Sequence, residues 1–335
     1  MMGAIGEGVT SVPQNLRALY APVATELDDV ERLLQEELSS ENPFVDQLAQ
    51  HGFRLGGKRI RPALVLLSGL ATGSLKPEHT KLAVAVELIH TASLVHDDVL
   101  DEATLRRHLD TVNARWNNET SVLLGDYLFA RAMCLTSSLD DCLACQVVSQ
   151  SARNMCEGEL TQIHSRGNYD LSEAEYVRIV AGKTAALMST CCRLGAHYAG
   201  ATASTVDALA HYGHDLGVAF QIADDVLDLV GEESAVGKSL GTDLSKQKAT
   251  LPLIRLLAAV TPAERAELQS LLSNEDDHHR DALRPWLARY DAIAYARDRA
   301  RSFTHRASNN LATLPHSPST ESLLGLAGFV IERRQ

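Results

Sequence analysis

Helix-forming stretches rich in alanine and leucine fill most of this sequence and constrain its fold more than any other feature. Strand signals are scarce, and short breakers such as residues 71–74 and 165–168 separate the stretches. Because 78–95 and 208–229 are apolar on most faces, they are expected at the centre of one large all-α bundle. The helices are expected at about 13–38, 42–51, 59–71, 78–101, 119–137, 141–165, 172–199, 204–230, 250–258, 261–273, 280–311 and 319–334.

Charge and composition exclude one class of partner and restrict another. The chain has 335 residues, with 31 Lys and Arg against 43 Asp and Glu, and therefore a formal net charge of −12. Nucleic-acid binding needs a basic stripe, so no nucleic-acid partner is expected. An anionic substrate would need a local cluster of Lys and Arg, or a bound cation.

Targeting and redox signals are weak. Residues 1–12 lack a basic segment followed by an apolar one, and the longest apolar run, 62–71, is too short to span a bilayer. A cytoplasmic protein without a transmembrane segment is expected. The cysteines lie in apolar, helix-like stretches and are expected to be free buried thiols: Cys134, Cys142, Cys145, Cys156, Cys191 and Cys192.

Two clusters of aspartates share one spacing. Asp97, Asp98 and Asp101 end one apolar helix, and the pattern repeats at Asp224, Asp225 and Asp228. Carboxylates four residues apart share a helix face, and their repulsion beside apolar helix needs an offsetting charge. A divalent cation with carboxylate and water ligands supplies one, and magnesium on a substrate phosphate is typical of such sites. A solvated acidic helix end explains one cluster but not two.

Basic groups accompany these clusters in sufficient number for two diphosphates. The sequence predicts that magnesium held by both aspartate clusters grips the diphosphate that leaves, while Lys and Arg hold the one that stays. Arg59 is expected to be a solvated charge. The basic segments are Gly57–Lys58–Arg59–Ile60–Arg61, Arg106–Arg107, Lys183–Thr184, and the loop lysines Lys238, Lys246 and Lys248.

In this order, the motifs resemble the trans-isoprenyl diphosphate synthases, also called polyprenyl synthetases. The resemblance implies the all-α isoprenoid synthase fold, a single antiparallel bundle around a central cavity, within one domain covering 1–335. It places the motif-bearing core at about 50–255 and leaves 1–12 as a flexible tail. It also implies a homodimer that uses magnesium, three ions per site. The motifs carrying it include Gly57–Pro62, Glu87–His90, the two aspartate clusters, Gly125–Asp126, Glu157–Gly158–Glu159 with Gln162, Tyr176 and Gly241–Asp243.

The same resemblance implies a reaction and its residues. Isopentenyl diphosphate would condense with dimethylallyl, geranyl or farnesyl diphosphate to give a linear all-trans polyprenyl diphosphate. Asp97, Asp101 and Asp224 would be the metal ligands, supported by Asp98, Asp225 and Asp228. The isopentenyl diphosphate site would comprise Gly57, Lys58, Arg61, His90 and Arg107. The allylic site would comprise Arg106, Lys183, Thr184, Gln221, Lys238 and Lys248.

One departure from the family stands beside this second site. Where the family commonly has Gly-x-Pro-Thr after the arginine pair, this chain has His108–Leu109–Asp110–Thr111. Glycine and proline both shape the backbone, so this loop is expected to close differently. Catalysis is expected to survive because every ligand-type residue is present.

Product length is predicted from the helix that carries the first aspartates. Ser93 lies one turn, about 6 Å, below Asp97, with Ala92 beside it and Ile89 a turn further down. In the resembling family a Phe or Tyr at this level stops the chain short. Small residues here predict a medium or long product, hexaprenyl to decaprenyl, of the kind used as a quinone side chain. If Tyr127 or Phe129 supplied a floor, the product would be geranylgeranyl diphosphate.

Other functions fit less well. A class I terpene cyclase would need a different second metal motif and no Gly57–Pro62 segment. A non-catalytic subunit of a heteromeric synthase would be expected to lose Asp or Arg residues, and none is lost here. A metal-buffering protein would leave the basic clusters unexplained. Loose membrane association for product release is compatible with the sequence.

Overall fold

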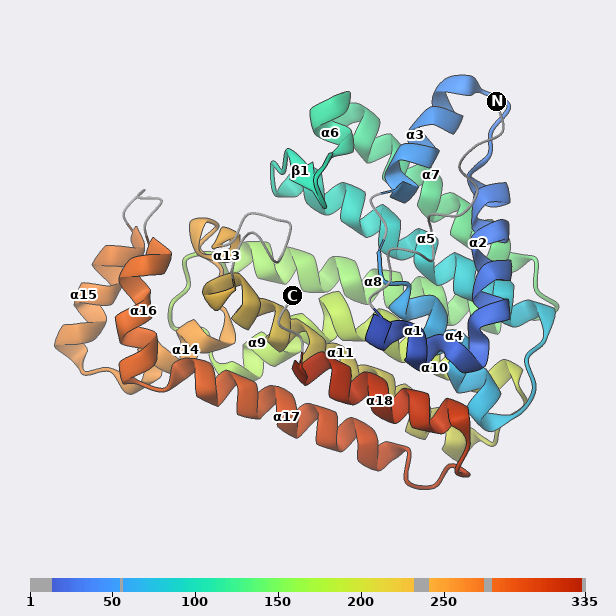
Figure 1. Cartoon of the computed structure of the whole chain (residues 1–335). Coiled ribbons are helices and arrows are strands. Elements are labelled where there is room, and N and C mark those ends of the chain that lie inside the picture. Colours follow the sequence, from blue (N-terminus) through green and yellow to red (C-terminus); the bar gives the residue numbers. More distant parts are fainter. Residues whose placement is uncertain (1–13, 55–56, 232–240, 274–278, 333–335) are drawn as a thin grey trace. The chain divides into compact units, whose positions relative to one another are not determined.

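The computed structural model describes residues 14–54, 57–231, 241–273 and 279–332. Within them the chain is almost wholly helical, as predicted, and the only strands are two of two residues each (Figure 1). The predicted tail, 1–12, lies outside the described residues. The described residues form two compact units. Unit 1 takes those up to Ala152 with Leu187–Gly213 and Leu311–Leu326, and unit 2 takes Arg153–Ala186, His214–Asn310 and those from Ala327.

Unit 1 is built around α5. Its central turns, from Leu82 to Ile89, are buried on every side, which explains the lack of a polar face. Helices α7, α4 and α2 pack against α5. The elements of this part of the chain are α1 (Gln14–Tyr20), the 3₁₀ turn η1 (Ala21–Val23), α2 (Ala24–Leu38), α3 (Pro43–Arg54), α4 (Ile60–Thr72), α5 (Pro77–Leu100), β1 (Leu105–Arg106), β2 (Leu109–Asp110), α6 (Val112–Arg115) and α7 (Asn118–Ser137).

Unit 2 has its own apolar core, where Leu253, Leu256, Leu268 and Leu283 are buried together. Helices α8 (Leu143–His164), α11 (Ala203–Val230) and α18 (Pro318–Glu332) contribute residues to both units, and α10 (Ala186–Tyr198) belongs almost entirely to unit 1. The remaining elements are α9 (Glu173–Val180), the π-helical turn η2 (Ala181–Ala185), α13 (Thr242–Ser245), α14 (Leu251–Ala259), α15 (Pro262–Ser273), α16 (His279–Arg289) and α17 (Ala292–Asn310).

Helix boundaries follow local signals, but three predicted helices are interrupted, the one over 13–38 by the 3₁₀ turn η1, and the short helices α6 and α13 were not predicted. The Ser172–Glu175 capping box opens α9, because the serine accepts from the Glu175 N–H while the glutamate accepts from the Ser172 N–H. The helix expected over 172–199 is interrupted by the π turn η2, and the one expected over 280–311 breaks before α17 at Asp291, whose φ is +51°. Neither a wide helical turn nor a left-handed residue leaves a signal in the helical periodicity.

The cysteine prediction was partly wrong. Cys191 and Cys192 are buried, but Cys134, Cys142 and Cys156 are exposed. They occupy outward positions on α7 and α8 or just before α8, and periodicity alone does not tell which helix faces a neighbour covers. No helix in the described ranges is long and apolar enough to cross a membrane. The cytoplasmic location stays a prediction.

Candidate active site

The first aspartate turn ends α5. Asp98 is buried, 1% exposed, whereas Asp97 and Asp101 are half-buried. Arg106 grips the Asp98 carboxylate with two nitrogens: Nε lies 2.9 Å and Nη2 2.8 Å from Oδ1. A buried carboxylate held in this two-pronged way is charge-compensated within the protein. The two outer aspartates are the more accessible carboxylates, and Asp98 fixes the side chain of Arg106.

The hairpin β1–β2 carries both arginines of the Arg106–Arg107 pair. Leu105 pairs with Asp110 and Arg106 with Leu109, so Arg107 and His108 form a two-residue turn with φ of +51° and +63°. Two left-handed residues define a type I′ turn, which matches the twist of a tight hairpin. The segment that replaces the family's Gly-x-Pro-Thr therefore still closes as a compact hairpin, although the left-handed position after Arg107 carries the side chain of His108.

Side chains from α3 and α6 anchor this hairpin. The Nε2 atom of His51 lies 2.8 Å from the backbone oxygen of Asp110, and Arg115 Nη1 lies 3.3 Å from His51 Nδ1. The ring of Trp116 meets His51 edge-on at 5.2 Å. These contacts fix the loop whose conformation the sequence did not specify.

The residues predicted to bind isopentenyl diphosphate gather in unit 1. A Cβ on Gly57 would lie 2.0 Å from Arg107 Nη2, so the glycine allows the guanidinium to cover the backbone. The pKa of His90 is well below its usual 6.5, first because of burial and then because Arg61, Arg106 and Arg107 lie near it. His90 is therefore a neutral group within a cationic corner.

The prediction for Arg59 was wrong. It is not solvated: its side chain is 10% exposed and lies between the carboxylates of Glu31 and Glu87. Both partners are distant in sequence, on α2 and α5, so the local Gly-Gly-Lys-Arg pattern gave no sign of them. Their charges stabilise the cationic form and raise the pKa of Arg59, outweighing its burial.

The second aspartate turn, on α11, has different partners. Asp225 is 5% exposed and accepts from the Tyr176 hydroxyl at 2.5 Å and from Gln221 Nε2 at 2.8 Å. Burial, with Asp243 and Asp224 nearby, raises the pKa of Asp225 to about 7. Neutral donors, a hydroxyl and an amide, therefore hold this carboxylate.

Asp228 accepts hydrogen bonds from the segment that begins α13. It is 1% exposed, and its carboxylate accepts from the backbone N–H of Asp243 at 3.2 Å and from Thr242 Oγ1 at 3.3 Å. Its backbone oxygen accepts from Gly241 at 3.1 Å. Asp228 thus orders the start of α13, while Asp224 remains the half-buried, accessible carboxylate of this turn.

Lys183 and Thr184 lie on the π turn η2. Lys183 forms an ion pair with Glu159 and donates to Gln162 Oε1 at 3.0 Å, both on α8. Thr184 Oγ1 donates to Gln221 Oε1 at 2.8 Å. A Cβ on Gly158 would lie 2.5 Å from the backbone nitrogen of Lys183, so α8 approaches the π turn closely through this glycine. Such turns recur at functional sites because they reposition side chains and carbonyls.

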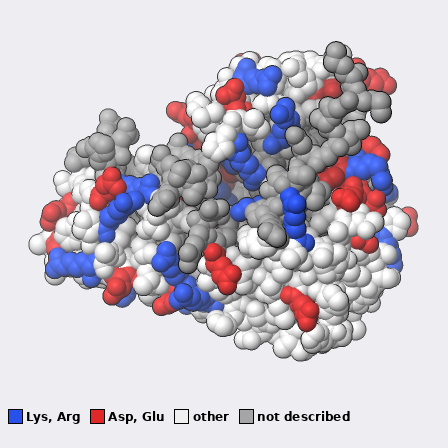
Figure 2. All heavy atoms as spheres, in the orientation of Figure 1, with Lys and Arg blue, Asp and Glu red and all other residues white. Residues whose placement is uncertain are grey.

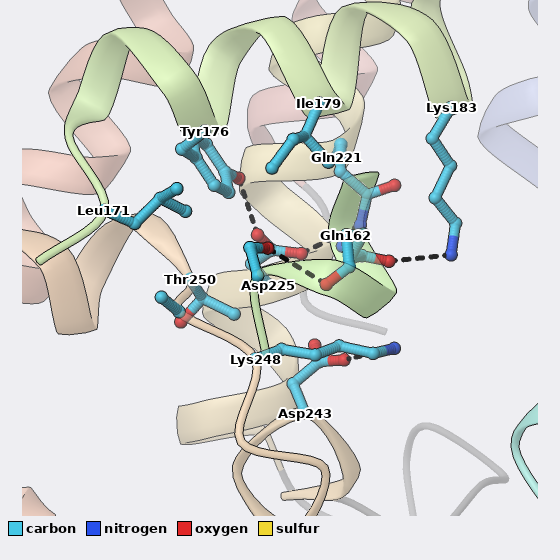
Figure 3. A pocket seen from close by; sticks show the side chains of 12 residues that line it. Gln162, Leu171, Tyr176, Ile179, Lys183, Gln221, Asp225, Asp243, Lys248 and Thr250 are labelled. Atoms are coloured by element: carbon cyan, nitrogen blue, oxygen red, sulfur yellow. Dashed lines mark hydrogen bonds and ion pairs between the residues drawn. The ribbon is translucent and has the colours of Figure 1, made fainter. Parts of the chain in front are cut away.

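These side chains line a pocket wholly within unit 2 (Figure 3). Tyr176 and Gln221 point toward Asp225, Lys183 reaches Gln162, and Lys248 pairs with Asp243 at 3.2 Å. Leu171 and Ile179 supply apolar wall, and the buried Thr250 hydroxyl has no hydrogen-bond partner. The pocket joins predicted allylic-site residues to Gln162, Asp243 and Thr250, to which the sequence prediction gave no role.

Lys238 lies outside the described residues.

Among those described, no three His, Cys, Asp or Glu side chains are grouped closely enough to hold a metal ion by themselves. Magnesium keeps several waters and takes one or two carboxylates with substrate phosphates, so it needs no such cage. The half-buried carboxylates Asp97, Asp101 and Asp224 are oxygen donors of this kind. The donor chemistry therefore fits a divalent cation.

The three positions predicted to set product length lie on α5. Ile89 and Ala92 are buried, and Ser93 is half-buried, its hydroxyl donating to the His90 carbonyl at 2.8 Å. Phe129 is 37% exposed on α7, which disfavours it as an internal floor in one chain. Tyr127 is half-buried.

Figure 2 shows described Lys and Arg side chains in separate groups, with acidic side chains between them. This fits the expectation that any anion site is local.

Comparisons with known proteins agree with these features. Residues 42–287 match the family model described as polyprenyl synthetase. The chain is 34% identical over 322 residues to octaprenyl diphosphate synthase of Escherichia coli, covering 95% of this chain and 99% of that protein. It is 36% identical to heptaprenyl diphosphate synthase component 2 of Geobacillus stearothermophilus over 95% of this chain and 99% of that protein.

Solved structures give the same answer for the fold. A decaprenyl diphosphate synthase from Rhodobacter capsulatus superposes with a TM-score of 0.90 at 36% identity, covering 96% of this chain and 99% of that one. A polyprenyl synthase from Caulobacter crescentus, complexed with calcium and isoprenyl diphosphate, gives 0.91 at 34% identity, covering 97% and 99%.

Proposed function

Because this chain belongs to the polyprenyl synthetase family and is a prenyltransferase with the all-α isoprenoid synthase fold, we propose that it condenses isopentenyl diphosphate with an allylic diphosphate. The allylic partner is dimethylallyl, geranyl or farnesyl diphosphate, and the product is a linear all-trans polyprenyl diphosphate. One observation carries the proposal: the same aspartate turn ends α5 and recurs on α11, each with basic side chains in its own unit.

The outer aspartates suit metal binding, and the middle ones suit the positioning of neighbouring side chains. Magnesium held by Asp97, Asp101 and Asp224 would supply Lewis-acid chemistry at the diphosphate that leaves. Asp98 holds Arg106, and Asp225 holds Gln221 and Tyr176. Each supporting carboxylate thereby orients a residue that the substrate would meet.

The allylic diphosphate would bind Lys183, Lys248, Arg106 and Lys238. Lys183 would exchange its contact with Glu159 for a phosphate oxygen, since both are anions competing for one ammonium group. The oxygens of Thr184 and Gln221 would face the positive charge that develops on the allylic chain. Leu171 and Ile179 would keep water from that end of the pocket, where it would otherwise react with the allylic cation.

Isopentenyl diphosphate keeps its diphosphate, so direct hydrogen bonds suffice. Lys58, Arg61 and Arg107 would bind it, with neutral His90 beside them. The C1–O bond of the allylic diphosphate would break first and release pyrophosphate, and the isopentenyl double bond would then attack C1 of the allylic cation. The proton then lost from the isopentenyl unit passes to the released pyrophosphate.

The product should be medium or long, hexaprenyl to decaprenyl, a quinone side-chain precursor. Ala92 and Ser93 support this because neither is large enough to block a growing chain at that level of α5. The comparison with octaprenyl and decaprenyl diphosphate synthases supports the same range.

A second copy of the chain is the proposed partner. Along α7, Val122, Leu123 and Phe129 are 43%, 67% and 37% exposed. Large apolar side chains gathered on one helix face are typical of an interface, and self-pairing is the commonest arrangement. Light scattering of the purified protein should give twice the chain mass, and Leu123→Glu with Phe129→Glu should halve it.

Product analysis tests the function. Purified protein is incubated with magnesium, labelled isopentenyl diphosphate and each primer in turn, and chain length is read by reversed-phase chromatography. Products of six or more isoprene units are expected, and a stop at four would establish a geranylgeranyl diphosphate synthase instead. The likeness to a protein named component 2 makes activity of the chain alone a deciding control. No elongation with any primer or divalent metal would contradict the proposal.

A further inference from the structure

Arg59 is an almost fully enclosed basic group in one of the predicted substrate segments. Its Nε lies 2.5 Å from Glu31 Oε1 and its Nη1 lies 2.7 Å from Glu87 Oε1. The three side chains are 10%, 14% and 3% exposed. The ring of Phe53 packs against the guanidinium at 4.4 Å. Helices α2, α3 and α5 thus converge on one side chain of the segment before α4.

The guanidinium is fully engaged by protein. Its third nitrogen, Nη2, also faces Glu31, at 3.4 Å from Oε2. Two carboxylates around one cation leave a net negative charge, which would repel a diphosphate rather than bind it. Arg59 therefore has a task other than contacting substrate.

The backbone at Arg59 is held in a costly conformation. Its φ of +53° and ψ of +32° are left-handed, which is unfavourable for a residue other than glycine. Such conformations persist where the surroundings determine them. Here the Tyr20 hydroxyl donates to the carbonyl of the preceding Lys58 at 2.9 Å, and the Arg59 carbonyl accepts from Ala63 at 3.1 Å.

The neighbours of Arg59 in sequence are the proposed ligands of isopentenyl diphosphate. Lys58 precedes it, and Arg61 lies two residues on, in the first turn of α4. Glu87 is three residues before His90 on α5. Binding an intact diphosphate by direct hydrogen bonds requires donors held within about 0.5 Å of their productive positions.

We infer that Arg59 is a positioning residue: clamped by Glu31 and Glu87, it fixes the left-handed link between Lys58 and Arg61 and so aims both at isopentenyl diphosphate. This rests on the proposed function of Lys58 and Arg61. The clamp acts on the affinity for that substrate and leaves the allylic site, whose described residues other than Arg106 lie in unit 2, without a direct effect.

Arg59→Lys tests the inference in the full-length protein. It keeps the charge but loses the planar fork that reaches two carboxylates at once. Calorimetric titration with isopentenyl diphosphate should show affinity falling about 10- to 100-fold. The KM for isopentenyl diphosphate should rise by the same factor, while kcat at saturation and the KM for the allylic primer stay within about threefold of wild type.

A matched control separates positioning from simple loss of a salt bridge. Arg131 pairs with Glu37 at 2.8 Å in the same unit, with side chains 34% and 20% exposed. Arg131→Lys should leave the affinity for isopentenyl diphosphate unchanged. If Arg59→Lys does not fold, Glu31→Gln, which retains Glu87 as a charged partner, takes its place with the same expected direction.

Two further variants distinguish the possible failures. If Lys58→Ala and Arg61→Ala leave isopentenyl diphosphate binding intact, the proposed site itself is wrong. If both weaken binding and Arg59→Lys does not, the site stands and the positioning role is overturned. Equal effects of Arg59→Lys and Arg131→Lys would likewise overturn it.

Discussion

The two aspartate turns share a spacing but not an electrostatic environment. On α5 the middle carboxylate, Asp98, is gripped by the cation of Arg106. On α11 the corresponding Asp225 is held by neutral donors, Tyr176 and Gln221, and its pKa is raised to about 7. The first carboxylate is compensated by a cation within its own unit, whereas burial and neighbouring carboxylates favour the protonated form of the second. Two motifs with the same spacing can therefore differ in how their middle carboxylates are stabilised.

The largest effects are expected at the outer carboxylates, where the two turns should behave alike. Asp97→Asn and Asp224→Asn each remove a proposed metal ligand and should lower kcat by about 10²- to 10³-fold, the loss typical of a transition-state electrostatic contact. Steady-state turnover across a magnesium titration measures this. Asp207→Asn, which changes a side chain 58% exposed and paired with Arg193, should change nothing. A loss at only one turn would show that the other holds no metal.

The middle positions should behave differently. Arg106→Met leaves Asp98 buried without its cation and should reduce the free energy of unfolding by roughly 3 kcal/mol. Tyr176→Phe removes one neutral donor from Asp225 and should cost about 1 kcal/mol. Urea unfolding of both variants measures the difference.

Asp98→Asn in the Arg106→Met protein provides the control for that contrast. Removing the stranded charge should restore most of the lost stability, although not the activity. Equal destabilisation by Arg106→Met and Tyr176→Phe would contradict the distinction drawn between the two turns.

The basic corner beside the first turn should show a pH response of known sign. His90 has a pKa below 6.5 in the folded protein, so the unfolded chain binds its proton first as the pH falls. The contribution of His90 to stability should be complete above pH 6.5 and fall below it, with a slope of at most about 1.4 kcal/mol per pH unit. Unfolding free energies between pH 5 and 8 measure this, and His90→Asn should flatten the dependence. An unchanged slope in that variant would assign the response to another group.

How far the sequence predicts this molecule depends on the range of each interaction. The all-α fold, most helix positions and the aspartate turns follow from spacings of three or four residues, which one chain segment contains. Arg59 shows what does not: its partners Glu31 and Glu87 are 28 residues away on either side. The Tyr176–Asp225 and Lys183–Glu159 pairs are equally non-local. The π turn at Lys183 is invisible for another reason, because one extra residue in a helical turn hardly changes the apolar pattern.

The smallest expected effect concerns the hairpin that carries Arg106 and Arg107. His108 sits at a left-handed position of a type I′ turn, where glycine is free of the Cβ clash. His108→Gly should raise the free energy of unfolding by about 1 kcal/mol or less, because the glycine also gains freedom in the unfolded chain. Leu109→Gly, at a paired strand position of the same hairpin, should instead lower it. Thermal unfolding of the two variants measures the sign, and since Arg106 would keep its grip on Asp98, turnover by His108→Gly should stay near wild type. A stabilised variant that lost turnover would show that the His108 side chain itself serves the first aspartate turn.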